Sequence, residues 1–263
     1  AVIKKLKKIL EDPSIKKIGQ NIKFDFIVFY KCGITLSSME DTMLMSYVLD
    51  AGKNRHNMDT LSEIHLGHKT ISFKEMVGTG KKEINFSEVE LDKAKDYAAE
   101  DADVTFRLYK KFIKNLKSEK MINIYEIFEK PLIKILAFME IEGVEIDSKF
   151  LKSLSSKFEK KIQKLEKEVF KISKKEFNIA SPKQLGEIIY NDLKIAGLKK
   201  TKKGSFATSA SVLEDLAFKG HEFPKLILDW RQVSKLKNTY SDALPEHLNP
   251  NTKRVHTSFL LAA

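Results

Sequence analysis

An acidic segment containing one tyrosine is the first part of this sequence that could support catalysis. In Tyr97–Asp103 (YAAEDAD), the tyrosine and Asp101 stand four residues apart and would share one face of a helix. That face continues through Leu108, so Asp101 should point inward, whereas Glu100 and Asp103 diverge from it. A buried carboxylate must be hydrogen-bonded, paired with a cation or bound to a metal. Helical phase alone leaves these alternatives open.

The segment Gly19–Asp25 (GQNIKFD) is a second candidate. It is either an ordinary strand-to-helix turn with Asn21 as the N-cap, or it brings Asp25 together with Asp101 around divalent cations. Hard cations such as Mg²⁺ prefer carboxylate oxygens, and nucleases commonly hold two of them about 4 Å apart. Two aspartates are too few for such a site, so further ligands would be needed.

Other catalytic motifs are incomplete. Gly78–Lys81 is similar to a phosphate-binding loop but lacks that loop's first glycine and its final hydroxyl residue. His65 and His68 have no third metal ligand and are expected near a helix end. Cys32 has no evident histidine partner for nucleophilic catalysis. Because it is the single cysteine of the sequence, no disulfide framework or cysteine-rich zinc site can be built, which favours a reducing compartment. Nucleophilic hydrolase chemistry is therefore not expected.

The elements that must position these residues are predicted from apolar spacing and capping signals. We expect a strand at 15–19 and helices at 1–12, 21–30, 42–49, 58–66 and 87–117. Asp41 is the expected N-cap of the third helix, Gly67 the end of the fourth, and Ser87 with Glu90 the capping box of the helix that carries Asp101. Residues 1–129 thus mix strands and helices.

The rest of the chain is predicted to be almost wholly helical, with helices at 124–142, 148–177 and 223–244. Gly143 should end the first of them. The second carries an apolar seam that should pack against the third; its residues are Leu151, Leu154, Phe158, Ile162, Leu165, Val169 and Ile172. Leu198–Ser209 reads as an exposed tip and Arg254–Leu260 as a short strand. We expect boundaries of 1–129, 130–248 and 249–263.

The charge is basic and unevenly distributed. The net charge is +11, and sixteen lysines against seven acidic residues lie between Asp147 and Gly204. This distribution fits either a solvated helix in a lysine-biased proteome or a face that binds a polyanion, of which nucleic acid is the commonest. No apolar run approaches the roughly 20 residues needed to span a bilayer, so no membrane partner is expected.

Several motifs together resemble the family A DNA polymerases, in particular the large (Klenow-type) fragment of the bacterial enzymes. Gly19–Asp25, Asp41–Leu44 and Tyr97–Thr105 (YAAEDADVT) look like the second and third exonuclease motifs of that family. The helical half matches in family order and spacing; its matching segments are Phe177-Asn178, Ser181–Leu185, Thr208-Ser209, Arg231–Tyr240 (RQVSKLKNTY) and Arg254–Thr257.

The resemblance implies an α/β, RNase H-like 3′–5′ exonuclease domain followed by an all-α polymerase thumb and the start of a palm. It implies that Asp101 ligates one Mg²⁺ directly (Mn²⁺ or Zn²⁺ as alternatives), Asp25 helps to hold a second through water, and Tyr97 orients the attacking water. It implies DNA as the partner. Single-stranded 3′ ends would contact Gln20, Asn21 and Arg55, and primer–template duplex would contact Asn178, Ser181, Thr208, Arg231, Lys235 and the tip at Lys199–Lys203.

The sequence also departs from the family pattern. The first exonuclease motif, an Asp-x-Glu on an early strand, should lie upstream of Ala1, and the palm aspartates should lie beyond Ala263. We therefore expect an interior segment of a longer, monomeric polymerase, cytoplasmic in a bacterium or phage, or else organellar (plastid or mitochondrial). The alternatives are a catalytically inactive DNA-binding module and, less in keeping with one long helix, a coiled-coil scaffold.

Overall fold

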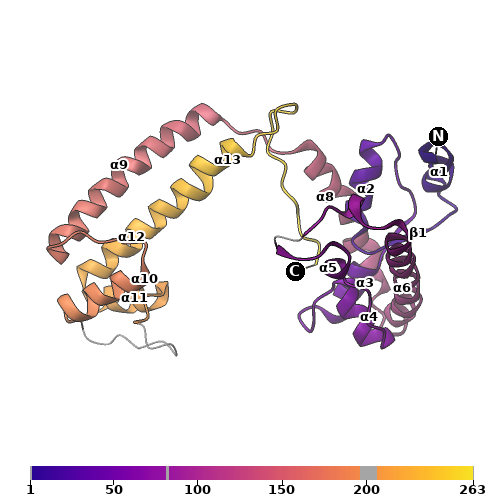
Figure 1. Ribbon diagram of the computed structural model, residues 1–263, viewed down its shortest axis with the longest axis horizontal. Coiled ribbons are helices and arrows are strands. Elements are labelled where there is room, and N and C mark those ends of the chain that lie inside the picture. Colours follow the sequence, from indigo (N-terminus) through magenta and orange to yellow (C-terminus); the bar gives the residue numbers. More distant parts are fainter. Residues whose placement is uncertain (1, 81–82, 196–205, 263) are drawn as a thin grey trace. The chain divides into compact units, whose positions relative to one another are not determined.

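The computed structural model describes residues 2–80, 83–195 and 206–262, and the chain divides into two compact units (Figure 1). The first unit comprises Ala1–Gly143 and Thr257–Ala263, and the second comprises Val144–His256. The expected boundary after residue 129 differs from this division, because helix α8 (Lys130–Glu142) packs on helix α2 (Ile22–Lys31) inside the first unit. The expected tip at Lys199–Lys203 lies outside the described residues.

A two-stranded parallel sheet organises the first unit. Strand β1 (Lys17–Gly19) pairs with β2 (Met39–Asp41), with Lys17 opposite Met39 and Gly19 opposite Asp41. Parallel strands need a crossover, which α2 provides between them. The strand predicted at 15–19 is confirmed in a shorter form. The helix predicted at 42–49 is confirmed, since α3 begins at Thr42. Strand β2, which lies immediately before it, was not predicted.

The helices of the first unit enclose one core. Residues Phe26, Leu44, Leu61, Leu108 and Phe112 are fully buried in it. The predicted ends at Gly67 and Gly143 are confirmed, and both glycines have positive φ. The remaining helices of this unit are α1 (Val2–Glu11), α3 (Thr42–Asp50), α4 (Met58–Leu66), α5 (Phe73–Val77), α6 (Leu91–Ser118) and α7 (Ile122–Ile124).

One predicted helix start is wrong. Helix α6 begins at Leu91, because the capping box forms two residues earlier than predicted, between Asn85 and Glu88, and caps a short 3₁₀ turn instead. The helix predicted at 124–142 is present, but a π-helical turn at Tyr125–Glu129 lies between α7 and α8. These differences do not move Tyr97 or Asp101 off the long helix, so the predicted element for the acidic segment is confirmed.

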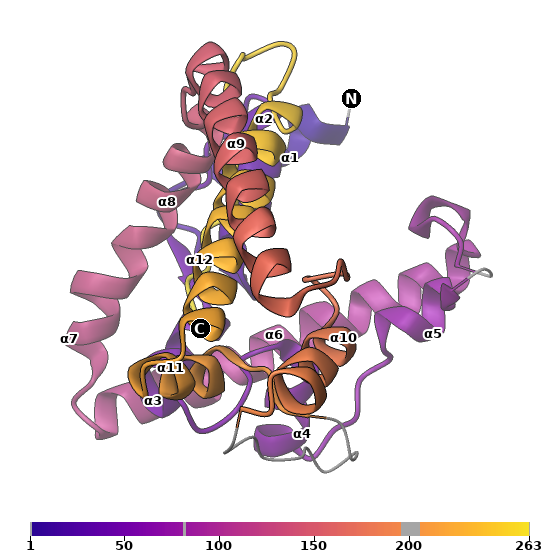
Figure 2. The ribbon, with the colours of Figure 1, turned by 90° about the vertical axis from the view of Figure 1, so that its left-hand side faces the viewer.

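The second unit is built on two long antiparallel helices, which lie side by side in both views (Figures 1 and 2). Helix α9 (Ser148–Ser173) and helix α12 (Glu222–Leu236) are joined where the Trp230 indole donates to Glu166 (3.1 Å), and Lys237 pairs with Glu159 just beyond α12 (3.4 Å). The predicted seam of α9 is confirmed, since all of its residues are partly or fully buried.

Shorter elements complete the second unit. They are α10 (Pro182–Glu187), α11 (Ala210–Phe218), α13 (Ala243–Glu246) and two π-helical turns at Ile188–Asp192 and Lys237–Asp242. The strand predicted at Arg254–Leu260 is wrong: Val255 makes only isolated bridges, to Val144 and Leu248. None of the helices in the described ranges is both long and apolar enough to cross a membrane.

Candidate exonuclease site and nucleic-acid interface

The buried carboxylate of Asp41 fixes the turn that carries the first candidate residues. It accepts hydrogen bonds from four backbone N–H groups, those of Asn21 (3.0 Å), Ile22 (3.0 Å), Met43 (2.9 Å) and Leu44 (3.4 Å). Asp41 therefore caps α3, as predicted, and also α2. Burial raises its pKa to about 6, and the four backbone hydrogen bonds lower it against that effect.

The turn before α2 is shaped by close packing. A Cβ on Gly19 would lie 2.9 Å from the Ile22 side chain, so only glycine fits there. Asn21 occupies the N-cap position with left-handed backbone geometry (φ 56°), but its side chain makes no capping bond. The predicted Asn21 cap is therefore present only as a backbone position. Asp41, 20 residues later, satisfies the free N–H groups instead.

Asp25 projects from the first turn of α2. Its side chain is exposed and lines a hollow of about 260 Å³ together with Ile18, Gly19 and Ile22. Neighbouring protein still displaces enough water to raise the pKa of Asp25, and its own backbone hydrogen bond lowers it in part. The carboxylate is thus within reach of solvent and of ions.

Tyr97 and Asp101 lie one turn apart on α6, as the sequence predicts, and interact with each other. Loss of hydration is the largest effect on both groups. It raises the pKa of Tyr97 to about 12, and the adjacent Asp101 adds to that shift. It also raises the pKa of Asp101, against the hydrogen bond from Tyr97. Oδ1 of Asp101 is buried and has no hydrogen-bond partner in the described part of the chain.

Glu100 holds the loop between α4 and α5, a role that was not predicted from the sequence. Its carboxylate interacts with Nε2 of His68 (2.7 Å) and accepts a hydrogen bond from the Ile71 N–H (2.7 Å). On α4, Asp59 accepts a hydrogen bond from Thr70 (2.7 Å) in the same loop. The expectation that Glu100 would point away from the packed face is wrong. Its side chain is partly buried by a loop about thirty residues earlier in the sequence.

Two phenylalanine rings border Tyr97. The rings of Phe73 and Phe86 stack on each other at 5.8 Å, and their centroids lie 6.4 and 6.0 Å from that of Tyr97. Both phenylalanines keep substantial exposure (50% and 37%). The Tyr97 hydroxyl is therefore placed by an aromatic cluster on one side and by Asp101 on the other.

The two aspartates predicted as metal ligands are separate features of this unit. The acidic groups that raise the pKa of Asp101 are Glu100 and Asp59. Asp25 does not contribute to the pKa shift of Asp101 or of Tyr97. The described residues contain no group of three Asp, Glu, His or Cys side chains that could hold a metal ion. A metal site that used either aspartate would need further ligands.

The residues expected to contact single-stranded DNA differ in exposure and in their hydrogen bonds within the protein. The Gln20 amide donates to the carbonyl of His56 (2.7 Å) and accepts from the Thr42 hydroxyl (2.5 Å), so it is held inside the fold. Asn21 and Arg55 are exposed, and the Arg55 guanidinium makes no ion pair with any described residue. The Arg55 guanidinium is therefore exposed to solvent.

The residues expected to contact duplex DNA in the second unit divide in the same way. Arg231 is partly buried and donates to the carbonyl of the buried Thr208 (2.7 Å), so both stabilise the fold. Ser181 caps α10 by accepting from the Gln184 N–H (3.4 Å). Asn178 and Lys235 are exposed on the surface, and Oδ1 of Asn178 accepts from the Ala180 N–H (3.0 Å).

Comparison with known proteins agrees with these motifs. The 3′-5′ exonuclease family matches residues 1–117, and DNA polymerase family A matches residues 148–263. The chain belongs to the family A DNA polymerases. The exonuclease match lies within the first unit, and the family A polymerase match covers most of the second unit together with the returning residues 257–263.

Curated relatives of this polymerase segment are bacterial. It is 48% identical to DNA polymerase I of Rhizobium leguminosarum over 98% of the chain and 26% of that protein. It is 41% identical to DNA polymerase I of Pseudomonas aeruginosa over 98% of the chain and 29% of that protein. The chain thus spans about a quarter of the length of these relatives.

A solved structure has the same fold as the family A segment. The POL domain of Pol1 from M. smegmatis, in complex with DNA primer-template and dNTP, superposes with a TM-score of 0.77 at 25% sequence identity. The match covers 97% of this chain and 41% of that one. The expected fold, an exonuclease region followed by a helical polymerase region, is confirmed.

Proposed function

We propose that this segment supplies the 3′–5′ proofreading exonuclease and the duplex-holding thumb of a bacterial, cytoplasmic DNA polymerase of family A. The Tyr97–Asp101 pair is the single observation that carries the proposal, because it joins an unpartnered buried carboxylate oxygen to a phenol within an exonuclease motif. A structural aspartate would use that oxygen in a hydrogen bond.

Asp101 fits a divalent cation. Its Oδ1 is buried and has no hydrogen-bond donor among the residues that the structure describes, and a carboxylate oxygen is the ligand that Mg²⁺ and Mn²⁺ prefer. Asp25, exposed and partly desolvated, is the proposed contributor to a second cation, with the remaining ligands supplied from elsewhere in the protein. Bound there, such ions would stabilise the charge that develops on the phosphate.

Tyr97 is the proposed orienting group for the attacking water. A tyrosine phenol is protonated at neutral pH, and the raised pKa of Tyr97 extends that state to more alkaline pH, so the hydroxyl is a hydrogen-bond donor. The rings of Phe73 and Phe86 restrict its movement, and the Asp101 carboxylate accepts its proton in a hydrogen bond. A water molecule beside Tyr97 would be held by its hydroxyl.

DNA is the proposed partner of both units. In the first, exposed Arg55 and Asn21 are the proposed direct contacts to a single-stranded 3′ end. Gln20 is proposed to support that surface through its hydrogen bonds to His56 and Thr42. In the second, Asn178, Ser181 and Lys235 are proposed to touch the backbone of primer–template duplex, since backbone contacts suit an enzyme that must hold any sequence. Thr208 and Arg231 are proposed to support that surface through their hydrogen bond to each other.

The test compares two aspartates of α6 in the full-length protein. Asp101→Asn removes charge from the unpartnered carboxylate, whereas Asp103→Asn alters an exposed residue paired only with Arg107 (3.4 Å). We expect Asp101→Asn to lower Mg²⁺-dependent release of 3′ nucleotides from single-stranded DNA at least about 100-fold while DNA binding is retained. Asp103→Asn should remain close to wild type.

A catalytically inactive DNA-binding module is the second candidate, favoured by the absence of a three-ligand group among the described residues. It predicts salt-sensitive DNA binding with no metal-dependent nucleotide release from the wild-type protein. Equal cleavage by wild type and Asp101→Asn would instead reject the assignment of Asp101.

A further inference from the structure

Lys23, in the middle of the Gly19–Asp25 motif, is a buried lysine whose charge is used inside the protein. Only 4% of the residue is exposed, and its ammonium donates to Oε1 of Glu140 on α8 and to the carbonyl of Phe259. The Phe259 N–H donates to the same Glu140 oxygen (2.7 Å). Two side chains thus hold both the N–H and the carbonyl of one backbone residue.

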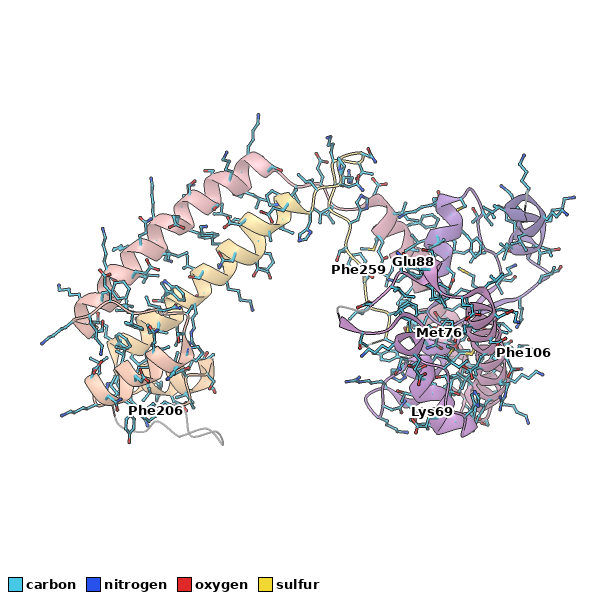
Figure 3. All side chains as sticks on the ribbon, viewed as in Figure 1. Lys69, Met76, Glu88, Phe106, Phe206 and Phe259 are labelled. Atoms are coloured by element: carbon cyan, nitrogen blue, oxygen red, sulfur yellow. The ribbon has the colours of Figure 1, made fainter. Side chains whose placement is uncertain are left out.

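Phe259 belongs to the segment that returns from the second unit to the first (Figure 3). The chain leaves the first unit after Gly143, three residues beyond Glu140, and re-enters it at Thr257, two residues before Phe259. The contacts of Lys23 and Glu140 therefore lie beside the two points at which the chain leaves the first unit and re-enters it.

We infer that Lys23 and Glu140 form a clasp that fastens the returning polymerase segment, residues 257–262, to helix α2 of the exonuclease region. The clasp gives Lys23 a task distinct from DNA or metal binding, although it lies between Asn21 and Asp25. It also makes the position of α2 depend on a segment that belongs to the polymerase family match.

The surroundings of Lys23 explain why its ammonium group needs both of its hydrogen-bond partners. Lys23 and Glu140 line a cavity of about 110 Å³ together with Phe24, Ile27, Met43 and residues 258–262. A buried lysine is costly unless it is paired and hydrogen-bonded. If the returning segment moved away, Lys23 would lose its carbonyl acceptor and Glu140 would lose its amide donor.

The two segments that connect the units are also hydrogen-bonded to each other within the second unit. Val144 and Val255 exchange a pair of backbone hydrogen bonds, 2.8 and 2.9 Å, immediately after the chain leaves and just before it returns. Those bonds hold the two connecting segments together within the second unit. The Lys23–Glu140 clasp holds their other ends within the first.

Hydrogen exchange in the full-length protein, followed by mass spectrometry of peptides covering 22–31 and 257–262, tests the clasp. Lys23→Met should speed exchange in 257–262, and Glu140→Gln should speed exchange in α2, by about 10- to 100-fold, which corresponds to the loss of charged hydrogen bonds. Lys31→Met, an exposed lysine on the same helix, is the matched control and should change neither peptide.

The double variant Lys23→Met/Glu140→Met guards against a failure to fold, because it leaves no unpaired buried charge. We expect it to keep wild-type circular dichroism and still to exchange faster in 257–262. Wild-type exchange in both peptides of this folded double variant would overturn the clasp. None of these readouts depends on nuclease activity, so the clasp and the proposed function can fail separately.

Discussion

Replacing Asp41 by alanine should destabilise the first unit more than the loss of an ordinary helix cap. The substitution leaves four backbone N–H groups without their acceptor, two at the start of α2 and two at the start of α3. One lost N-cap costs about 1 kcal/mol, and a buried N–H left unsatisfied costs about 1–3 kcal/mol. Because these effects overlap, we expect a total of about 3–5 kcal/mol, a large share of a typical domain stability of about 5–15 kcal/mol.

Urea unfolding followed by two probes measures this effect. The only tryptophan, Trp230, lies in the second unit, so its fluorescence reports that unit, whereas far-ultraviolet circular dichroism reports both. Asp41→Ala should lower the urea midpoint of the first unit, which is seen by circular dichroism and not by Trp230 fluorescence. The matched control is Asp147→Ala, which removes the cap of α9 alone (Phe150 N–H to Asp147, 2.9 Å) and should cost about 1 kcal/mol in the Trp230 transition. Equal costs for the two variants would refute the double-cap interpretation.

Three further predictions concern packing, hydrogen bonding and pH. Gly186→Ala should destabilise the second unit by about 1–3 kcal/mol, seen by Trp230 fluorescence, because the new Cβ would lie 2.8 Å from Cβ of Phe206 (Figure 3); an unchanged midpoint would contradict this. Tyr125→Phe removes a buried hydroxyl that donates to Glu40 (3.0 Å) and accepts from the Asp41 N–H (2.9 Å), and should cost about 1–3 kcal/mol in urea unfolding. The pKa of Asp41 is raised from 3.8 to about 6, so the folded state binds the proton more tightly. As the pH is raised from 4 to 6, the free energy of unfolding of the wild type relative to Asp41→Asn should therefore fall, by at most about 3 kcal/mol, and it should level off above pH 6. An increase in this free energy over the same range would contradict the raised pKa.

Elements with a long local signal could be predicted from the sequence. The seam of α9 repeats over about six turns, and Gly67 and Gly143 stop their helices with positive φ, so local spacing alone was sufficient. Strand β2 gave no such signal, since three consecutive buried residues show no alternation between two faces. The π-helical turn at Tyr125–Glu129 was also missed, because it keeps an apolar helical pattern.

The candidate site shows the same limit. The Tyr97–Asp101 pair follows from helical spacing and was predicted, as was Asp41 as the cap of α3. The capping of α2 by the same carboxylate was missed because its partners lie 20 residues earlier in the sequence. The role of Glu100 was missed for the same reason, since it depends on a distant loop. Tertiary partners of this kind leave no periodic trace in a single sequence.

Metal binding by Asp101 is the central claim, and titration of Mn²⁺ by electron paramagnetic resonance tests it most directly. The full-length wild-type protein, Asp101→Asn and Asp103→Asn would be compared at equal concentration, with free Mn²⁺ measured from its signal. We predict that Asp101→Asn loses at least about tenfold in Mn²⁺ affinity at one site, while Asp103→Asn binds as the wild type does. Identical Mn²⁺ binding by all three proteins would contradict the account.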